Sequence, residues 1–457
     1  MGHGAPSPKP RGGRLLRLNQ ILVRLAAAAV VGLPIALIPG APSAATGRVL
    51  YVDQHNRGCS NWGSGTARRP FCGIGPAAAI VGPGQTVRVA AGSYAENVRV
   101  SRSGTSRAPV VFTAAPGAKV IVHGRASGFT ITGKNWVRIT GFRVTQTASY
   151  GIAVSNSSHV TLAHNQVSYS GQPLPNLASY GIRLGHVTNS LVTNNRVHHN
   201  TNAGIALVDN SSGNTVKANE SFANAQGFQR GASGIRMFAA PRNILAGNFV
   251  HDNEDSGIES DSGANDTLVN NIIYRNGDHG IDDSKAPGNR IIANTVYKNT
   301  TSGINVEGNS TGVTIANNIS VDNGINSPRS RGNILVDASS TPGTTMDFDL
   351  VYLSTPDKLL VWGSSSYFSL AAFRAATGRE VHGIQADPKW IDAPIGNFHL
   401  RAGSPAIDAA NSAVSGQPSR DVKRRGRFDD PAIPNTGAGP RTYDDRGSFE
   451  FRPPRHP

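Results

Sequence analysis

The residues with the strongest potential for chemistry lie in one short stretch, GDHGIDDSK at positions 277–285. It places Asp278, His279, Asp282, Asp283 and Lys285 within nine residues, although acids are scarce in the rest of this basic chain. Carboxylates packed this closely repel one another unless something neutralises them. Oxygen ligands of this kind suit Ca²⁺. The stretch therefore predicts a calcium site, and the alternative is a solvated acidic face without a bound ion.

The elements that must position these side chains belong to an internal repeat. A Gly-Ile pair recurs every 23 residues, or every 30 where seven more are inserted. The glycines of this column are Gly151, Gly181, Gly204, Gly234, Gly257, Gly280 and Gly303. Two columns of asparagine keep nearly the same spacing, one from Asn165 to Asn318 and the other from Asn200 to Asn323. Such a period indicates a solenoid, and the short β-branched segments favour stacked rungs of parallel strands over helices.

The repeat also predicts which side chains face outward. Side chains alternate along a strand, so the residue after each Gly-Ile pair should point out of the solenoid. The outward column contains Ala153, Arg183, Ala206, Arg236, Glu259, Asp282 and Asn305. Ser260 and Asp283 break the pattern, because they take inward positions that are apolar in the other copies. A buried unpaired carboxylate is costly, so either the strand bends outward or the site is built around a cation.

Five acids from neighbouring rungs are expected to converge on this cation. They are Asp255, Glu259, Asp261, Asp278 and Asp282.

The repeat resembles the right-handed parallel β-helix superfamily, with the pectate-lyase-like fold, over roughly residues 48–340. The stretch NGDHGIDD resembles more narrowly the family 9 polysaccharide lyases. In that family a rung with the pattern Asp-Asp-Gly-apolar-Asp holds Ca²⁺, together with an Asp of the preceding rung. On this resemblance Asp278 and Asp282 match the first and last acids of the rung, and Asp255 matches the acid of the preceding rung. His279 departs from the pattern, because it stands where the family has its second Asp.

The resemblance also implies a catalytic base, which this chain does not supply in the family's way. The family uses a lysine beyond this rung, but residues 299–357 contain no Lys. β-Elimination on a uronic acid polymer needs a cation on the substrate carboxylate, a base for the C5 proton and a group that assists the leaving oxygen. We expect Lys285 or Arg236 to act as the base. Arg236, Arg183 or His279 would bind the polymer or assist the leaving oxygen.

The two ends of the chain complete an expected all-β fold, a β-helix with an N-terminal helical cap and an irregular C-terminal tail packed on the last rungs. Basic residues before an apolar run indicate a signal peptide at 1–45, and therefore a secreted protein. In an oxidising compartment Cys59 and Cys72 should form a disulfide. A capping helix is expected near Ala77–Ile80 and an amphipathic helix at 364–378. The remaining expected parts are the cap and first rungs at 46–100, the rungs at 101–340, and a capping region and tail at 341–457.

Charge and compartment indicate the class of partner. Loss of the signal peptide lowers the formal net charge from +15 to +10, which suits an anionic partner. Outside a cell that partner is expected to be an acidic polysaccharide, with no nucleic acid and no stable membrane association, and the protein is expected to be a monomer. The favoured function is a Ca²⁺-assisted polysaccharide lyase. The alternatives are a glycoside hydrolase that pairs Asp282 with Asp261 or Asp283, a uronate C5-epimerase, or a non-catalytic polysaccharide-binding protein.

Overall fold

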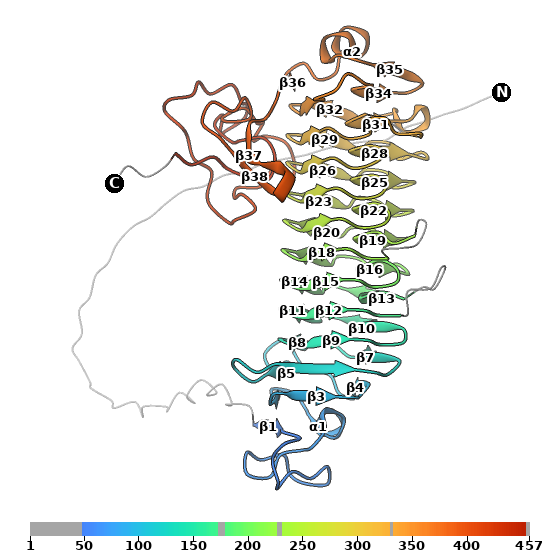
Figure 1. The fold of residues 1–457 in the computed structure, drawn as a ribbon, viewed down its shortest axis with the longest axis vertical. Helices are drawn as coiled ribbons and strands as arrows, with labels where there is room; N and C mark the ends of the chain where they lie inside the picture. Colours follow the sequence, from blue (N-terminus) through green and yellow to red (C-terminus); the bar gives the residue numbers. More distant parts are fainter. Residues whose placement is uncertain (1–47, 172–178, 226–230, 330–331, 454–457) are drawn as a thin grey trace, which may run out of the picture. The chain divides into compact units, whose positions relative to one another are not determined.

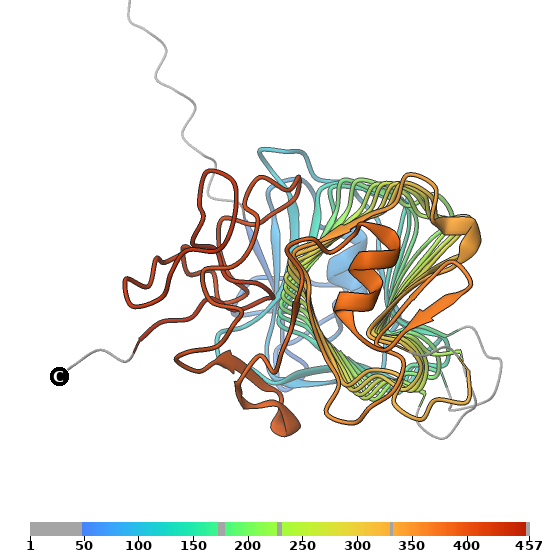
Figure 2. The ribbon, with the colours of Figure 1, turned by 90° about the horizontal axis from the view of Figure 1, so that it is seen from above.

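The computed structural model describes residues 48–453 except 172–178, 226–230 and 330–331. The expected signal peptide at 1–45 lies outside these residues. Successive turns of the chain add one strand to each of three sheets, and each sheet contains 12 strands (Figure 1). Seen along the stack, the sheets enclose a common interior (Figure 2). The chain therefore folds as the expected right-handed parallel β-helix.

The strands of each sheet follow one another along the stack. Sheet A contains β1 Val49–Val52, β2 Thr86–Val89, β5 Val110–Ala114, β8 Val137–Thr140, β11 Thr161–Ala163, β14 Leu191–Thr193, β17 Thr215–Lys217, β20 Ile244–Ala246, β23 Thr267–Val269, β26 Arg290–Ile292, β29 Thr314–Ala316 and β32 Thr345–Asp347. Sheet B contains β3 Gly92–Tyr94, β6 Val120–His123, β9 Arg143–Thr145, β12 Gln166–Ser168, β15 Arg196–His198, β18 Glu220–Phe222, β21 Phe249–His251, β24 Ile272–Tyr274, β27 Thr295–Tyr297, β30 Ile319–Val321, β33 Leu350–Tyr352 and β36 Ile384–Gln385. Sheet C, which carries the Gly-Ile column, contains β4 Val98–Val100, β7 Ser127–Thr132, β10 Tyr150–Ser158, β13 Ile182–Thr188, β16 Ile205–Val208, β19 Ile235–Phe238, β22 Ile258–Asp261, β25 Ile281–Ser284, β28 Ile304–Glu307, β31 Ile334–Val336, β34 Leu360–Trp362 and β35 Ser365–Tyr367.

The glycine column permits the rungs to approach closely. A Cβ on Gly257 would lie 2.7 Å from the carbonyl oxygen of Gly280 in the next rung, and 2.4 Å from Cγ2 of Ile273. A Cβ on Gly280 would lie 2.5 Å from the carbonyl oxygen of Gly303. A side chain at these distances would overlap the neighbouring rung. Glycine is therefore required here for space between the rungs.

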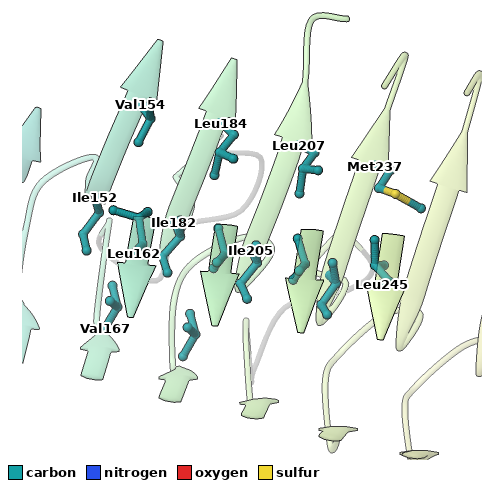
Figure 3. Packing of buried hydrophobic residues seen from close by; sticks show 14 of the residues in the cluster. Ile152, Val154, Leu162, Val167, Ile182, Leu184, Ile205, Leu207, Met237 and Leu245 are labelled. Carbon is teal, nitrogen blue, oxygen red and sulfur yellow. The ribbon is translucent and has the colours of Figure 1, made fainter. Parts of the chain in front are cut away.

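The apolar core is a stack of inward side chains. Ile152, Ile182 and Ile205 are fully buried and follow one another along sheet C (Figure 3). Burying a side chain of this size contributes about 1.5–3 kcal/mol. The contribution is repeated at each rung, so the stability of the solenoid comes mainly from contacts between neighbouring rungs. The predicted inward orientation of the Ile column is confirmed.

Buried amide side chains connect the rungs at the turns. Both predicted asparagine columns form hydrogen-bonded ladders: Asn248 Nδ2 donates to Asn271 Oδ1 at 2.9 Å in one, and Asn276 Nδ2 to Asn299 Oδ1 at 2.9 Å in the other. A third ladder was not predicted and runs through Ser190, Asn214, Asn243, Asp266 and Asn289. Because an unsatisfied buried amide costs free energy, these ladders favour a single register between rungs.

The N-terminal end is closed as expected. Cys59 and Cys72 form a disulfide, and helix α1 spans Ile74–Ile80, three residues longer at its start than expected. Its buried face includes Ile74 and Ala77. The helix therefore covers the apolar interior at the first rungs, where the solenoid has no further rung to stack on.

The C-terminal end differs from the expectation in two places. The segment 364–378 is a strand followed by a helix: β35 pairs antiparallel with β34, and α2 spans Leu370–Thr377. Ser369 begins this helix, because its Oγ accepts a hydrogen bond from the backbone N–H of Ala372. The rungs also continue past the expected boundary at residue 340, since β32, β33, β34 and β36 still belong to the three sheets.

The tail packs against the outer face of sheet B. It contains a hairpin of β37 Trp390–Asp392 and β38 Asn397–Leu400, and two short 3₁₀ helices lie at Ala338–Ser340 and Ala393–Ile395. The ring of Phe398 lies 5.2 Å from that of Tyr274, and Ser448 Oγ donates to the carbonyl oxygen of Asn271 at 2.9 Å. The tail thus lies on the later rungs, as expected (Figure 1). No helix among the described residues is long and apolar enough to span a membrane.

The close contact at the glycine column gives a test of the fold. We expect Gly257→Ala to lower the free energy of unfolding by about 1–3 kcal/mol, the usual cost of overpacking a core. Gly426→Ala is the matched control, because a Cβ there meets no atom within 4 Å. Thermal denaturation of the two variants checks this, and equal melting temperatures would contradict it.

Candidate functional site

The outer face of sheet C carries the predicted polar column in register. Arg236 of β19 lies beside Glu259 of β22, Glu259 beside Asp282 of β25, and Asp282 beside Asn305 of β28. Neighbouring strands lie about 4.8 Å apart, so these four side chains are direct neighbours. The predicted column is confirmed, although Asn305 is fully buried on this face.

Asp282 is the most perturbed acid of this column. Burial raises its pKa to about 7, against a hydrogen bond that Asn305 Nδ2 donates to Asp282 Oδ1 at 3.0 Å. The charges of Glu307, Asp278 and Asp255 raise the pKa further. Acids from three rungs therefore act on Asp282, and a cation at this place would relieve their repulsion.

Asp278 lies just before β25 and is held by donors from two sides. Its Oδ1 accepts a hydrogen bond from Thr301 Oγ1 at 2.5 Å and also contacts the guanidinium of Arg329. The Asp278 side chain is 4% exposed and that of Arg329 is 41% exposed. The backbone N–H of Asp278 donates to the carbonyl oxygen of Asp255 at 3.3 Å, which places these two acids one rung apart as predicted.

His279 is buried beside the same acid. Its Nδ1 lies 3.0 Å from Thr301 Oγ1, and its Nε2 lies 3.7 Å from Asp278 Oδ1. Burial lowers the pKa of His279, so its imidazole is neutral at pH 7. A neutral ring can offer one N–H and one acceptor nitrogen.

Two of the predicted ligands have other partners. Glu259 Oε2 accepts from Ser233 Oγ at 2.7 Å, and Glu259 Oε1 lies 3.3 Å from Arg236 Nε. Burial raises the pKa of Glu259, and the charge of Arg236 counteracts this. Asp261 Oδ1 accepts from Ser262 Oγ at 2.6 Å. These contacts direct the two acids toward protein donors.

Arg183 lies on the same face, four strands before Asp282. Its Nη2 lies 2.5 Å from Asp209 Oδ2, and its guanidinium lies 5.7 Å from the ring centre of Tyr150. The rings of Tyr150 and Tyr180 are stacked 6.0 Å apart. A cation and two aromatic rings therefore continue the face of sheet C toward the N-terminal rungs, which is a surface suited to sugar rings that carry carboxylates.

Lys285 lies at the other end of the acid strand. Asp278 precedes β25, whereas Lys285 follows it with an exposed side chain. Its backbone N–H donates to the carbonyl oxygen of Glu307 at 3.1 Å. Three residues along a strand span about 10 Å, so Lys285 would have to reach back along β25 to act beside Asp282.

Ser260 and Asp283 remain inside the solenoid, which overturns one of the two expected explanations for them. The strands do not bend outward, and both side chains are fully buried. They join a polar cluster with the third ladder: Asn289 Nδ2 donates to Asp283 Oδ1 at 2.5 Å and to Ser260 Oγ at 3.1 Å, and Ser260 Oγ donates to Asp266 Oδ2 at 3.3 Å. Burial raises the pKa of Asp266 to about 7 and that of Asp283 well above its usual range.

This interior position also removes one catalytic alternative. Asp282 points outward and Asp283 is sealed inside, so the two carboxyls cannot act together on one glycosidic bond. A hydrolase that pairs Asp282 with Asp283 is therefore wrong for this chain.

The acid patch fits a hard cation by the type of its donors. Asp255, Asp278 and Asp282 are carboxylates of two neighbouring rungs, and burial, followed by the charges of Glu307, Asp278 and Asp255, raises the pKa of Asp282. However, the described residues contain no group of three or more His, Cys, Asp or Glu side chains already arranged to hold a metal ion. The five predicted ligands thus do not form a ready cage, and a cation would have to draw the three aspartates together.

Comparison with known proteins agrees with this architecture. The family model described as "Pel9A-like, right handed beta helix region" matches residues 51–333. The chain belongs to this family. No match was found among curated proteins.

Two solved structures resemble this Pel9A-like chain over most of its length. One is described as pectate lyase Pel9A; it has 19% sequence identity and a TM-score of 0.55, and the match covers 89% of this chain and 97% of that one. The other is the complex of XylC with xylose, with 11% identity, a TM-score of 0.52, and coverage of 88% and 98%. At these identities the similarity shows the fold alone.

Two residues of the site in this Pel9A-like protein were not predicted from the sequence. Thr301 occupies the repeat position of Asp255 and Asp278, two residues before the glycine, so the repeat itself was a sufficient signal. Arg329 lies between β30 and β31, where the spacing from the last Gly-Ile pair is irregular. No column of the repeat places it beside Asp278.

The interior acids give a pH-dependent test. A raised pKa in the folded state means that folding resists ionisation of Asp283, so this group destabilises the fold as pH rises above about 3.9, its usual unfolded value. We expect Asp283→Asn to leave the free energy of unfolding nearly unchanged at pH 4 and to increase it at pH 8. Denaturant unfolding at the two pH values checks this. The exposed Asp392→Asn is the control, and a gain that is larger at pH 4 than at pH 8 would contradict the assignment.

Proposed function

We propose that this protein is a secreted polysaccharide lyase that cleaves a uronic-acid-containing polysaccharide by Ca²⁺-assisted β-elimination. The observation that carries the proposal is the register that sets Asp282 beside Glu259 on the outer face of sheet C, where the charges of Asp278 and Asp255 also raise its pKa. The similarity to a structure described as a pectate lyase supports this reaction class. The disulfide and the pattern of residues 1–45 support secretion.

β-Elimination requires four changes on the sugar. A base takes the C5 proton, the C–H electron pair forms a C4–C5 double bond, the C4–O bond breaks, and the leaving oxygen takes up a proton. Ca²⁺ held by Asp255, Asp278 and Asp282 would supply a Lewis acid for the uronate carboxylate. Thr301 fixes Asp278 and Asn305 fixes Asp282 through the hydrogen bonds already described. These two donors would hold the carboxylates in place beside the cation.

The candidates for the two proton transfers are basic groups near the same face. Lys285 is the first candidate for the base because it is exposed and follows the acid strand. Arg236 is the second candidate, but Glu259 lies within ion-pair distance of its guanidinium, which favours a role in substrate binding. His279 is our candidate for the group that assists the leaving oxygen, since a neutral ring can donate a hydrogen bond.

A panel of acidic polysaccharides tests the reaction. The purified protein is incubated with polygalacturonate, alginate and rhamnogalacturonan, each with Ca²⁺ or with a chelator. A lyase gives a rise in ultraviolet absorbance from unsaturated uronate ends, and this rise should disappear with the chelator. New reducing ends without that absorbance would indicate hydrolysis, and altered sugar composition without chain cleavage would indicate epimerisation. Either result would overturn the lyase assignment.

Asp282 gives the sharpest test of the cation site. We expect Asp282→Ala to abolish calcium binding measured by calorimetry, and to lower turnover by more than the roughly 100-fold that changes behind a metal ligand typically cost. The fold should persist, because an outward side chain contributes little to the stacked core. Asp392→Ala is the control, since Asp392 is exposed and lies in the tail hairpin. Full calcium affinity and turnover in Asp282→Ala would place the site elsewhere.

Arg183 tests whether the polymer lies along sheet C. Four strand steps separate Arg183 from Asp282, which is about 19 Å and corresponds to several sugar units. We expect Arg183→Ala to raise KM for long polymers about tenfold while kcat and the KM for dimers stay unchanged, because a dimer bound at Asp282 does not reach Arg183. Kinetics on substrates of graded length measure this. An equal effect at every length would contradict the proposed path.

A further inference from the structure

The disulfide-closed loop at the N-terminal end presents an exposed tryptophan. Trp62 is 99% exposed, more than any other large apolar residue in the part of the chain that the structure describes. The three other tryptophans, Trp136, Trp362 and Trp390, are partly buried. A single exposed apolar residue is ordinary on a protein surface, so Trp62 indicates a binding site only together with a second observation.

The second observation is the charge of the same loop. Residues 48–72 contain four arginines and a single acid, Asp53. Arg57, Arg68 and Arg69 are exposed, and none of the ion pairs among the described residues includes them. The loop therefore carries three unpaired cationic groups, which favour an anionic partner.

The fold places these arginines close to Trp62. The residue after Trp62 is a glycine, and a Cβ on it would lie 3.8 Å from the carbonyl oxygen of Arg69. The residue after Arg57 is also a glycine, and a Cβ on it would lie 3.3 Å from the carbonyl oxygen of Arg68. The aromatic ring and the three guanidiniums thus belong to two adjacent segments of one loop.

This loop is held in shape before any ligand binds. Cys59 and Cys72 close it with a disulfide. Asn61 Oδ1 accepts hydrogen bonds from the backbone N–H groups of Cys72 and Gly73, both at 3.0 Å. A surface that is already fixed loses little conformational entropy on binding, so the loop is organised for a ligand that has both an apolar face and negative charge.

We propose that this cap loop, residues 57–72, is a second binding site for an acidic polysaccharide. The ring of Trp62 would stack on the apolar face of one sugar ring. Arg57, Arg68 and Arg69 would bind carboxylates of the same and neighbouring sugars. The inference goes beyond the proposed lyase reaction, because this site holds the polymer without a cation and without cleaving it.

Two other partners fit the cap loop less well. Binding to a membrane surface needs a larger apolar area, whereas Trp62 lies in the small and polar stretch NWGSGTA. Symmetric contact with a second copy of the chain would bring identical groups of arginines together, and like charges repel. A sugar ring needs only one aromatic face, and an acidic polymer supplies the opposite charge.

The cap loop and the acid patch lie far apart along the stack (Figure 1). The loop follows β1, and nine strand steps of sheet A separate β1 from β26, the strand after β25, which is about 43 Å. This is several times the Debye length at physiological salt, so charges of the loop do not act on the acid patch. A long polymer that occupies both sites would bind more tightly than a short oligomer that reaches only one.

Tryptophan fluorescence tests the contact at Trp62. The purified protein is titrated with polygalacturonate, alginate and rhamnogalacturonan in the presence of a chelator, so that no divalent cation contributes. We expect an acidic polymer to change the fluorescence, and we expect Trp62→Ala to lose this change and to bind about tenfold more weakly, as is usual when an aromatic anchor is removed. Ile395→Ala is the matched control, because Ile395 is 76% exposed and lies in the tail.

The salt dependence of binding tests the arginines. The combined variant Arg57→Gln, Arg68→Gln and Arg69→Gln should bind more weakly at low salt, and its affinity should depend less on salt because fewer charges are screened. The control is the combined variant Arg420→Gln and Arg424→Gln, which removes two exposed charges of the tail. The cap variants should keep the wild-type melting temperature, since these side chains are exposed.

Unchanged polymer binding in Trp62→Ala, or no binding by the wild-type protein in the chelator, would overturn the inference. Binding to anionic lipid vesicles but to no polysaccharide would overturn it as well and would assign the loop to a membrane. Failure of the proposed function is distinguishable, because the rise in absorbance on short oligomers depends on the acid patch alone. If that rise is absent in every variant, the lyase assignment fails, while the fluorescence titration still decides the role of Trp62. A slower rise on short oligomers in Trp62→Ala would contradict a separate site.

Discussion

The close stacking of one rung on the next is the constraint on which the rest of this protein depends. At the glycine column the carbonyl oxygen of each rung lies only 2.5–2.9 Å from the place that a Cβ of the previous rung would take. Ladders of buried amides then fix the register, because a slip of one residue would leave their hydrogen bonds unmade and would turn apolar side chains outward. Once the register is fixed, Arg236, Glu259, Asp282 and Asn305 have to be neighbours on the outer face.

The same stacking brings acidic side chains together in one part of a basic protein. The acids on the outer face of sheet C and those on its inner face have different partners. Outside, Arg236 partners Glu259, and Arg329 and Thr301 partner Asp278. Inside, Asp266 and Asp283 are fully buried, and this burial raises the pKa of both. Asp282 and Asp283 are adjacent in the sequence, but Asp282 lies on the outer face of the strand and Asp283 is fully buried in the interior.

Much of the site was predictable because a solenoid converts spacing in the sequence into contact in space. The Gly-Ile period placed Asp255, Asp278 and Asp282 on neighbouring rungs, and the alternation of a strand placed Asp282 outward; the structure agrees with both. A different pattern, that of an amphipathic helix, gave a wrong prediction near the C-terminal end. The segment 364–378 has an amphipathic pattern throughout, but it turns after β35 because Ser369 caps a new helix there.

The sequence by itself determined the β-helix, the orientation of the Gly-Ile strands, the disulfide and the patch of acids, because each depends on local pattern or on a constant repeat. Tertiary structure alone decided which donors each acid meets. Glu259 turned out to face Arg236 and Ser233. Asp283 joined Asn289 and Ser260 inside the solenoid. Arg329 contacts Asp278, and it lies on the connection between β30 and β31, whose length does not follow the repeat. The position of a side chain on an irregular connection is decided only by the folded structure. No constant repeat relates its place in the sequence to its place in space.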